Sequence, residues 1–123
     1  MTRANYIRAP HFFNLDQACG TLREAFGPHI YLVGSSLSRR DHGDVDVRCI
    51  LPDEHYDRLF PGLCASAAPH RSALWSLVCA SISLWLSRHA DLPVDFQIQQ
   101  ATQANEQYPT EPRSALGLFL AQR

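Results

Sequence analysis

Lysine is absent from this chain, and all 11 of its basic residues are arginines. The absence excludes chemistry that depends on an amine nucleophile, on a Schiff base or on the lysine of a Walker-type phosphate loop. A charge excess of either sign is also missing, because 12 acidic residues leave a net charge of −1. A balance this close to neutral argues against broad electrostatic binding to duplex nucleic acid or to an anionic membrane.

Cysteines are few and widely spaced. No two of them form a C-x-x-C pair, and none makes a cluster of zinc-binding spacing with histidine. We therefore expect buried, reduced thiols in a cytoplasmic protein rather than disulfides or metal ligands. The four residues are Cys19, Cys49, Cys64 and Cys79.

Long apolar runs are lacking as well. The longest uncharged stretch lies between Arg71 and Arg88, and it is too short and too rich in serine to span a membrane. The first ten residues carry Arg3 and Arg8 without an apolar stretch behind them, so no secretory signal is expected. Nearly half of the 123 residues are apolar, which predicts that residues 1–123 form a single domain with one core.

Apolar residues that recur every three or four positions predict helices. One is expected over residues 14–26 and a shorter one over residues 53–60. A longer helix over residues 72–89 has a wide apolar face that includes Leu74 and Leu77. A helix this apolar is expected in the core or at an interface.

A short, mostly apolar and β-branched run at residues 29–33 fits a buried strand. Two-residue alternation predicts further strands over residues 44–51 and 93–99, each with one polar face. The remainder consists of a polar stretch at residues 100–107 and an apolar tail at residues 116–120, which is expected to fold back onto the core. Strands that alternate with helices in this order predict an α/β (α+β) fold, a small mixed β-sheet flanked by helices.

The most informative segment begins where the first strand ends, at Gly34 and Ser35. Backbone N–H groups and a hydroxyl converge at such a turn into a short helix, and glycine lets a phosphate approach closely. Ten residues after the glycine, Asp44 and Asp46 lie two apart on a strand and must project from one face. Two carboxylates held this close repel each other unless a cation lies between them, and Mg²⁺ is the natural cation beside a phosphate.

A third carboxylate, Asp95, lies between two apolar residues of the strand at 93–99 and faces away from the core. If the two strands are neighbours, Asp44, Asp46 and Asp95 form a triad able to bind two Mg²⁺ ions about 3.5–4 Å apart, as in-line nucleotidyl transfer requires. The alternatives are a solvated strand face for Asp44 and Asp46, and an ordinary strand start for Asp95.

Gly-Ser after an apolar strand, then Asp-Val-Asp-Val, then a later apolar-Asp-apolar strand form an ordered set. In this set residues 29–99 resemble the DNA polymerase beta-type nucleotidyltransferase superfamily, and the chain is closest in size to its minimal nucleotidyltransferases. The resemblance implies the nucleotidyltransferase fold. Metal-dependent glycosyltransferases also use Asp-x-Asp, but such folds usually need much longer chains.

The resemblance also implies a role for each motif residue. Gly34 and Ser35 would hold the β- and γ-phosphates of a nucleoside triphosphate, expected to be ATP. Asp44 and Asp46 would ligate both metal ions. Asp95 would complete the catalytic metal site and help to deprotonate an acceptor hydroxyl, which attacks the α-phosphate and expels pyrophosphate.

Further polar residues near the motif are candidates for nucleotide binding. Arg39 and Arg40 can clamp a triphosphate bidentately, although two arginines in a loop are often simply solvated. Arg48 continues the face of the aspartates, so it is expected to pair with a carboxylate or with the nucleotide. The hydroxyl of Ser36 is a candidate phosphate ligand too, but Ser36 and Ser38 better fit helix caps.

The expected activity is transfer of AMP from ATP to a hydroxyl. This short chain leaves three kinds of acceptor open: a small molecule, a partner protein whose surface completes the site, or a homodimer with a shared cleft. The resemblance favours a small helical partner protein, with this chain as the antitoxin half of a toxin–antitoxin pair. The alternative is a nucleotide-binding or partner-binding module of the same fold with little or no catalysis.

Overall fold

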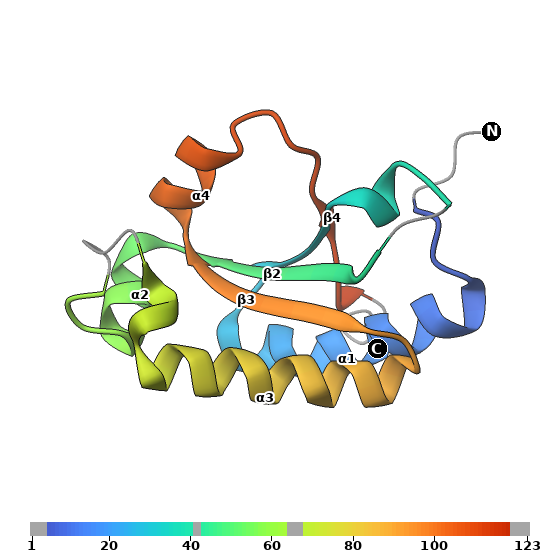
Figure 1. Cartoon of the computed structure of the whole chain (residues 1–123), viewed down its shortest axis with the longest axis horizontal. Coiled ribbons are helices and arrows are strands. Elements are labelled where there is room, and N and C mark those ends of the chain that lie inside the picture. Colours follow the sequence, from blue (N-terminus) through green and yellow to red (C-terminus); the bar gives the residue numbers. More distant parts are fainter. Residues whose placement is uncertain (1–4, 41–42, 64–67, 119–123) are drawn as a thin grey trace.

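A computed structural model describes residues 5–40, 43–63 and 68–118 of the chain. It combines helices with one β-sheet (Figure 1). The elements in chain order are α1 (Ala9–Phe26), β1 (Ile30–Val33), the 3₁₀ turn η1 (Ser35–Leu37), β2 (Val45–Leu51), α2 (Asp53–Leu59), the 3₁₀ turn η2 (Pro69–Arg71), α3 (Ala73–Ala90), β3 (Val94–Gln100), α4 (Ala101–Gln107) and β4 (Ser114–Ala115). Cys64 and the end of the expected apolar tail, at 119–120, lie outside the described residues.

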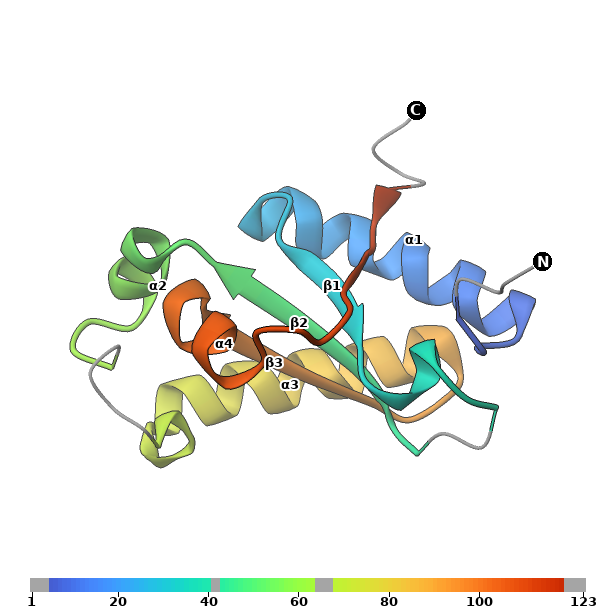
Figure 2. The same cartoon turned by 90° about the horizontal axis from the view of Figure 1, so that it is seen from above.

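The four strands form one mixed sheet in the order β3-β2-β1-β4. β2 runs parallel to β3, whereas β1 is antiparallel to both of its neighbours, β2 and β4. α1 and α3 pack against one face, which we call the covered face (Figure 1). α4 and the segment that leads from it to β4 cross the opposite, open face (Figure 2). The expected fold class, a small mixed sheet flanked by helices, is confirmed.

The core lies between the covered face and the two long helices. Every second residue of β1, β2 and β3 points into it, including Leu32, Val47 and Phe96, each at most 1% exposed. Leu15 of α1 and Leu86 of α3 meet them with no exposed surface. Because each such side chain contributes about 1.5–3 kcal/mol when buried, this layer supplies most of the driving force for folding.

The outer edge of β3 is closed by polar side chains of α3. Ser87 Oγ accepts from the N–H of Val94 at 2.9 Å, and Ser83 Oγ accepts from the N–H of Phe96 at 2.8 Å. Trp75 Nε1 donates to the carbonyl of Ile98 at 2.9 Å. An edge strand with free backbone groups invites pairing with other chains, so these contacts protect the sheet while holding β3 in place.

Two helix expectations need correction. Leu74 and Leu77, expected on the apolar face of the long helix, are 56% and 66% exposed, whereas Trp75 and Leu86 are buried. The helix is apolar on nearly all sides, so periodicity alone could not identify its inner face. The first helix begins at Ala9 rather than near residue 14, because proline is tolerated in a first helical turn.

The polar stretch after β3 forms the helix α4, which the sequence did not predict. Its alanine and glutamine residues are good helix formers, but a helix this short needs support. Asp53 of α2 provides it: its carboxylate accepts from the backbone N–H of Thr102 at 3.1 Å and from the Thr102 hydroxyl. The cap therefore comes from a residue distant in sequence, and it ties α4 to α2.

The C-terminal segment returns to the core as expected, as far as the structure describes it. Leu116 is 1% exposed, and the N–H of Gly117 donates to Asp16 Oδ1 at 2.7 Å. The described cysteines, Cys19, Cys49 and Cys79, are free and buried. Burial raises the pKa of Cys49 to about 12 and that of Cys79 to about 11, so neither is a thiolate nucleophile near neutral pH. None of the described helices is long and apolar enough to cross a membrane.

Candidate functional site

The turn after β1 depends on a glycine. Gly34 has φ +82°, a left-handed conformation that residues with a side chain rarely adopt. A Cβ at this position would lie 2.4 Å from Asp46 Oδ2, well inside any normal contact. The Gly-Ser turn therefore lies directly beside the carboxylate of Asp46, although Gly34 and Asp46 are twelve residues apart in sequence.

Asp46 and Asp95 are brought side by side by the pairing of β2 with β3. In the parallel register Asp46 lies opposite Asp95, and on its other side Asp46 lies opposite Val33 of β1. All three positions belong to the open face, because their strand neighbours Val45, Val47 and Phe96 point into the core. The row Val33–Asp46–Asp95 thus runs across the sheet, with Gly34 next to its first member.

Arg48 lies one row further along and spans the two carboxylates. Its guanidinium donates to Asp95 Oδ2 at 3.1 Å and to the carbonyl of Asp95 at 2.8 Å, and it lies 3.7 Å from Asp46 Oδ1. The side chain is only 13% exposed, so these contacts are shielded from water. In this arrangement a protein cation partly neutralises the two aspartates.

Burial raises the pKa of Asp46 above its usual value. Arg48 opposes that shift, while the negative charges of Asp95 and Asp44 add to it. A carboxylate that is short of solvent and crowded by like charge gains more from a bound cation than an exposed one does.

The expected triad is only partly assembled. Asp44 lies at an exposed position just before β2, outside the paired strand. Across residues 5–40, 43–63 and 68–118, no three His, Cys, Asp or Glu side chains form a group that could hold a metal ion. The structure therefore brings Asp46 and Asp95 together as the sequence suggested and leaves Asp44 exposed just before β2. Arg48 pairs with carboxylates, one of the two outcomes expected of it.

The remaining predicted nucleotide ligands occupy different environments. Ser35 is partly exposed at the start of η1, whereas Ser36 is fully buried and its Oγ has no hydrogen-bond partner within the described part of the chain. The N-terminal cap expected of Ser36 and Ser38 is wrong: no side chain caps the start of this turn, where Gly34 lies. Ser38 follows its end instead, and Ser38 Oγ donates to the carbonyl of Ser35 at 3.4 Å. Arg39 and Arg40 are exposed just beyond the turn.

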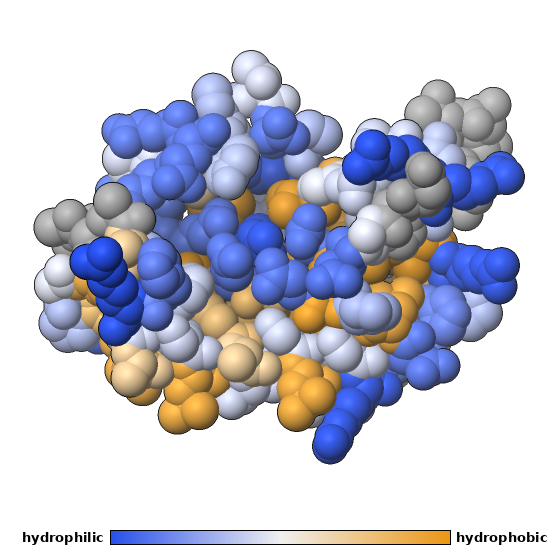
Figure 3. Space-filling model, viewed as in Figure 1, coloured by the Kyte–Doolittle hydropathy of each residue, from blue (hydrophilic) through white to orange (hydrophobic). Residues whose placement is uncertain are grey.

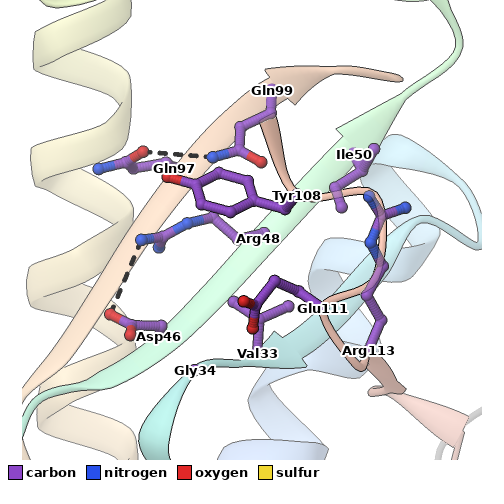
Figure 4. Close-up of a pocket in the computed structure, with 10 residues that line it drawn as sticks. All are labelled: Val33, Gly34, Asp46, Arg48, Ile50, Gln97, Gln99, Tyr108, Glu111 and Arg113. Carbon is purple, nitrogen blue, oxygen red and sulfur yellow. Dashed lines mark hydrogen bonds and ion pairs between the residues drawn. The ribbon is translucent and has the colours of Figure 1, made fainter. Parts of the chain in front are cut away.

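A pocket of about 330 Å³ opens on this face of the sheet (Figure 4). One end is formed by Gly34, Asp46 and Arg48, and the floor continues along β2 and β3 through side chains that sequence analysis had placed on the polar face. Its full lining is Val33, Gly34, Asp46, Arg48, Ile50, Gln97, Gln99, Tyr108, Glu111 and Arg113.

The residues that close this pocket from above were not predicted from the sequence. Tyr108, Glu111 and Arg113 reach over it from the segment between α4 and β4 (Figure 4). Nothing in their spacing signals a site, because only the fold lays this segment across the sheet. Gln97 and Gln99 did carry a signal, since their two-residue spacing from Asp95 puts them on its face.

The chain was also compared with known proteins. No family model matches it, and neither does any curated protein or solved structure.

Proposed function

We propose that this chain is a Mg²⁺-dependent nucleotidyltransferase of the nucleotidyltransferase fold, which transfers AMP from ATP to an acceptor hydroxyl and releases pyrophosphate. The observation that carries the proposal is the close approach of Gly34 to Asp46, together with the position of Asp46 opposite Asp95, on three adjacent strand ends. A turn suited to phosphate beside two carboxylates suited to metal is what this reaction needs in one place.

The residues fit a magnesium–nucleotide complex in chemistry. Mg²⁺ usually binds proteins through one or two carboxylates, and its remaining ligands come from substrate phosphates and water. Asp46 and Asp95 would supply those carboxylates, with Asp44, exposed just before β2, as a further ligand. Arg48 now neutralises the pair, so its guanidinium has to give way to the metal and is then free to bind a phosphate.

Each residue then has a definite task. Gly34 and Ser35 bind the β- and γ-phosphates, while Arg39 and Arg40 approach the triphosphate from the exposed side. The metal ions supply charge stabilisation to the α-phosphate and the leaving pyrophosphate. Asp95 accepts the proton of the acceptor hydroxyl, whose oxygen attacks the α-phosphorus as the bond to pyrophosphate breaks.

The acceptor lies on a small molecule or on a partner protein, and a small helical partner in a cytoplasmic toxin–antitoxin pair is the proposed setting. A homodimer with a shared cleft fits the same site. The exposed Leu74, Leu77 and Leu84 of α3 offer a partner apolar surface on the far side of the molecule from the pocket (Figure 3). They therefore suit attachment of a partner rather than recognition of its reacting group.

One observation favours a second candidate, a nucleotide-binding or partner-binding module without catalysis. The Arg48 guanidinium already occupies the place between the two carboxylates that a metal ion would take. A fold that no longer needs a metal could keep that pairing permanently. In such a module ATP binding does not depend on Mg²⁺, and no transfer follows.

Labelled ATP distinguishes the two. The purified protein is incubated with Mg²⁺ and a cell extract, once with ATP labelled at the α-phosphate and once at the γ-phosphate. Nucleotidyl transfer moves only the α-label onto an acceptor and releases pyrophosphate. Asp46→Asn and Asp95→Asn are expected to abolish the transfer, while Asp57→Asn, an exposed carboxylate on α2, leaves it intact. Transfer retained in both site variants contradicts the assignment.

A further inference from the structure

The pocket extends well beyond the carboxylates. Its floor follows β3 away from Asp95 through Gln97 and then Gln99, which at about 3.3 Å per residue lie about 7 and 13 Å further along the strand. Ligand pockets usually hold about 300–1,000 Å³, and this one, at about 330 Å³, is at the small end of that range. A site for phosphates at one end thus continues into a compact chamber at the other.

An aromatic ring closes that chamber. Tyr108, at the end of α4, lays its ring across the opening near Arg48 and Gln97 (Figure 4). Half of its surface is exposed, so one region of the ring has no protein packed against it. A tyrosine left uncovered over a polar pocket offers a planar surface on which another planar group can stack.

The segment that carries Tyr108 is held at both ends. Asp53 anchors the start of α4 through Thr102, and at the far end β4 pairs with β1. Arg113 Nη2 also donates to Asn105 Oδ1 at 2.8 Å, which links the far end of the segment back to α4. Pro109 and Pro112 reduce the freedom of the residues between these anchors. The ring is therefore positioned before any ligand binds.

Two amides form the floor opposite the ring. Gln99 Nε2 donates weakly to Gln97 Oε1, at 3.5 Å, which leaves the Gln97 amino group and the Gln99 carbonyl oxygen for other partners. Adenine presents an amino donor beside a ring-nitrogen acceptor, the pattern that a glutamine amide matches. Arginine suits guanine better, but in the proposed complex Arg48 binds a phosphate, and Arg113 donates to Asn105 Oδ1.

We propose that this chamber is the adenosine subsite of the ATP site: the base stacks on Tyr108, and the amides of Gln97 and Gln99 recognise its polar edge. The inference rests on the proposed function for the position of the phosphates, since they bind at Gly34 and Asp46. It makes Tyr108, Gln97 and Gln99 the residues that determine which nucleotide is used.

The test compares equilibrium binding of ATP, GTP, CTP, UTP and inorganic tripolyphosphate, each with Mg²⁺, to the full chain. Tyr108→Ala is expected to weaken ATP binding about tenfold, because the base loses the aromatic surface on which it stacks. Tripolyphosphate binding should not change, and Tyr108→Phe should bind ATP as the unaltered protein does. The exposed position of Tyr108 leaves the fold intact, which the melting temperature verifies.

The glutamines are tested for selectivity. Gln97→Ala and Gln99→Ala are expected to weaken ATP binding and to narrow its advantage over GTP, whereas Gln17→Ala, on α1 across the sheet, changes neither. Tighter binding of GTP than of ATP overturns the adenine assignment. The stacking site is overturned if the Tyr108→Ala variant binds ATP normally. It is also overturned if the variant loses affinity for ATP and for tripolyphosphate to the same extent.

The two proposals fail in different ways. ATP binding that depends on Tyr108 but leads to no transfer leaves the subsite standing and removes the proposed function. If transfer depends on Asp46 but is unaffected by substitutions of Tyr108, Gln97 and Gln99, the proposed function stands and the subsite is overturned. If none of the nucleotides nor tripolyphosphate binds, both are overturned.

Discussion

The two faces of the sheet come from the same strands, but one forms the core and the other carries the candidate site. On the covered face Leu32, Val47 and Phe96 have almost no exposed surface and differ little in chemistry. On the open face most of the alternate residues of β2 and β3 are polar: two carboxylates, an arginine and two amides, each partly exposed. The strand period of two lets selection act on stability and chemistry separately, because a change on one face leaves the other side of the backbone in place.

The largest test of this separation uses adjacent residues of β3. Phe96→Ala should lower the free energy of unfolding by about 3–5 kcal/mol, because it leaves a cavity in the core. Gln97→Ala should change it by no more than about 0.5 kcal/mol, as is usual at partly exposed positions. Urea denaturation measures both. Similar losses in the two variants contradict a division of labour between the faces.

The Gly-Ser turn tests the contact between the loop and the open face. Gly34→Ala should cost about 1–2 kcal/mol for its left-handed backbone and should also displace the Asp46 carboxylate, so ATP binding is lost. Gly62→Ala has a similar φ, +79°, with nothing near its Cβ, and therefore reports the backbone cost alone. Gly43→Ala, whose added Cβ would meet no heavy atom within 4 Å, serves as the neutral control. Equal stability and ATP binding in all three variants would refute the role of the Asp46 contact.

Arg48 is mostly buried like a core residue, but its contacts are hydrogen bonds and ion pairs. Arg48→Gln should destabilise the protein by about 1.5–3 kcal/mol in the presence of a chelator, the range for hydrogen bonds to charged groups. Mn²⁺ should then raise the melting temperature of the variant more than that of the unaltered protein, because a metal ion no longer competes with the guanidinium for Asp46 and Asp95. A smaller Mn²⁺ effect in the variant would show that Arg48 supports metal binding instead.

The smallest effect concerns pH, and two aspartates should respond with opposite sign. Burial raises the folded-state pKa of Asp46 above its usual 3.8, so the ionised side chain disfavours folding above that folded pKa, and the penalty disappears below pH 3.8. Hydrogen bonds from Thr102 lower the folded-state pKa of Asp53, so its ionised form supports folding above pH 3.8, and that support is lost as the pH falls through the lowered pKa.

Melting temperatures at pH 7 and at acid pH check both signs. Asp46→Asn should melt higher than the unaltered protein at pH 7, and Asp53→Asn should melt lower. Both differences should shrink toward acid pH, where the original carboxyls are protonated. A higher melting temperature at pH 7 for Asp53→Asn, or a lower one for Asp46→Asn, would contradict the stated environments.

How far the sequence predicted the site depends on the range of the interactions involved. The alternation along β2 and β3 placed Asp46, Arg48 and Asp95 on one face, and the glycine after β1 marked the turn. The start of α4 was not predictable, since its cap, Asp53, comes from another helix. The inner face of α3 was misassigned because its leucines occur on all sides, and only packing decides which of them are buried.

The sequence by itself determined the periods, the breaks and the residue types. It predicted three strands, two of them with one polar face, two long helices, and an ordered set of Gly-Ser and aspartates in a chain that has no lysine. Only the tertiary structure decided that β2 and β3 pair in register at Asp46 and Asp95, that Arg48 neutralises both, and that Tyr108 closes the pocket. Local preferences act over a few residues, whereas register and enclosure are fixed by the burial of a whole core, which no single segment encodes.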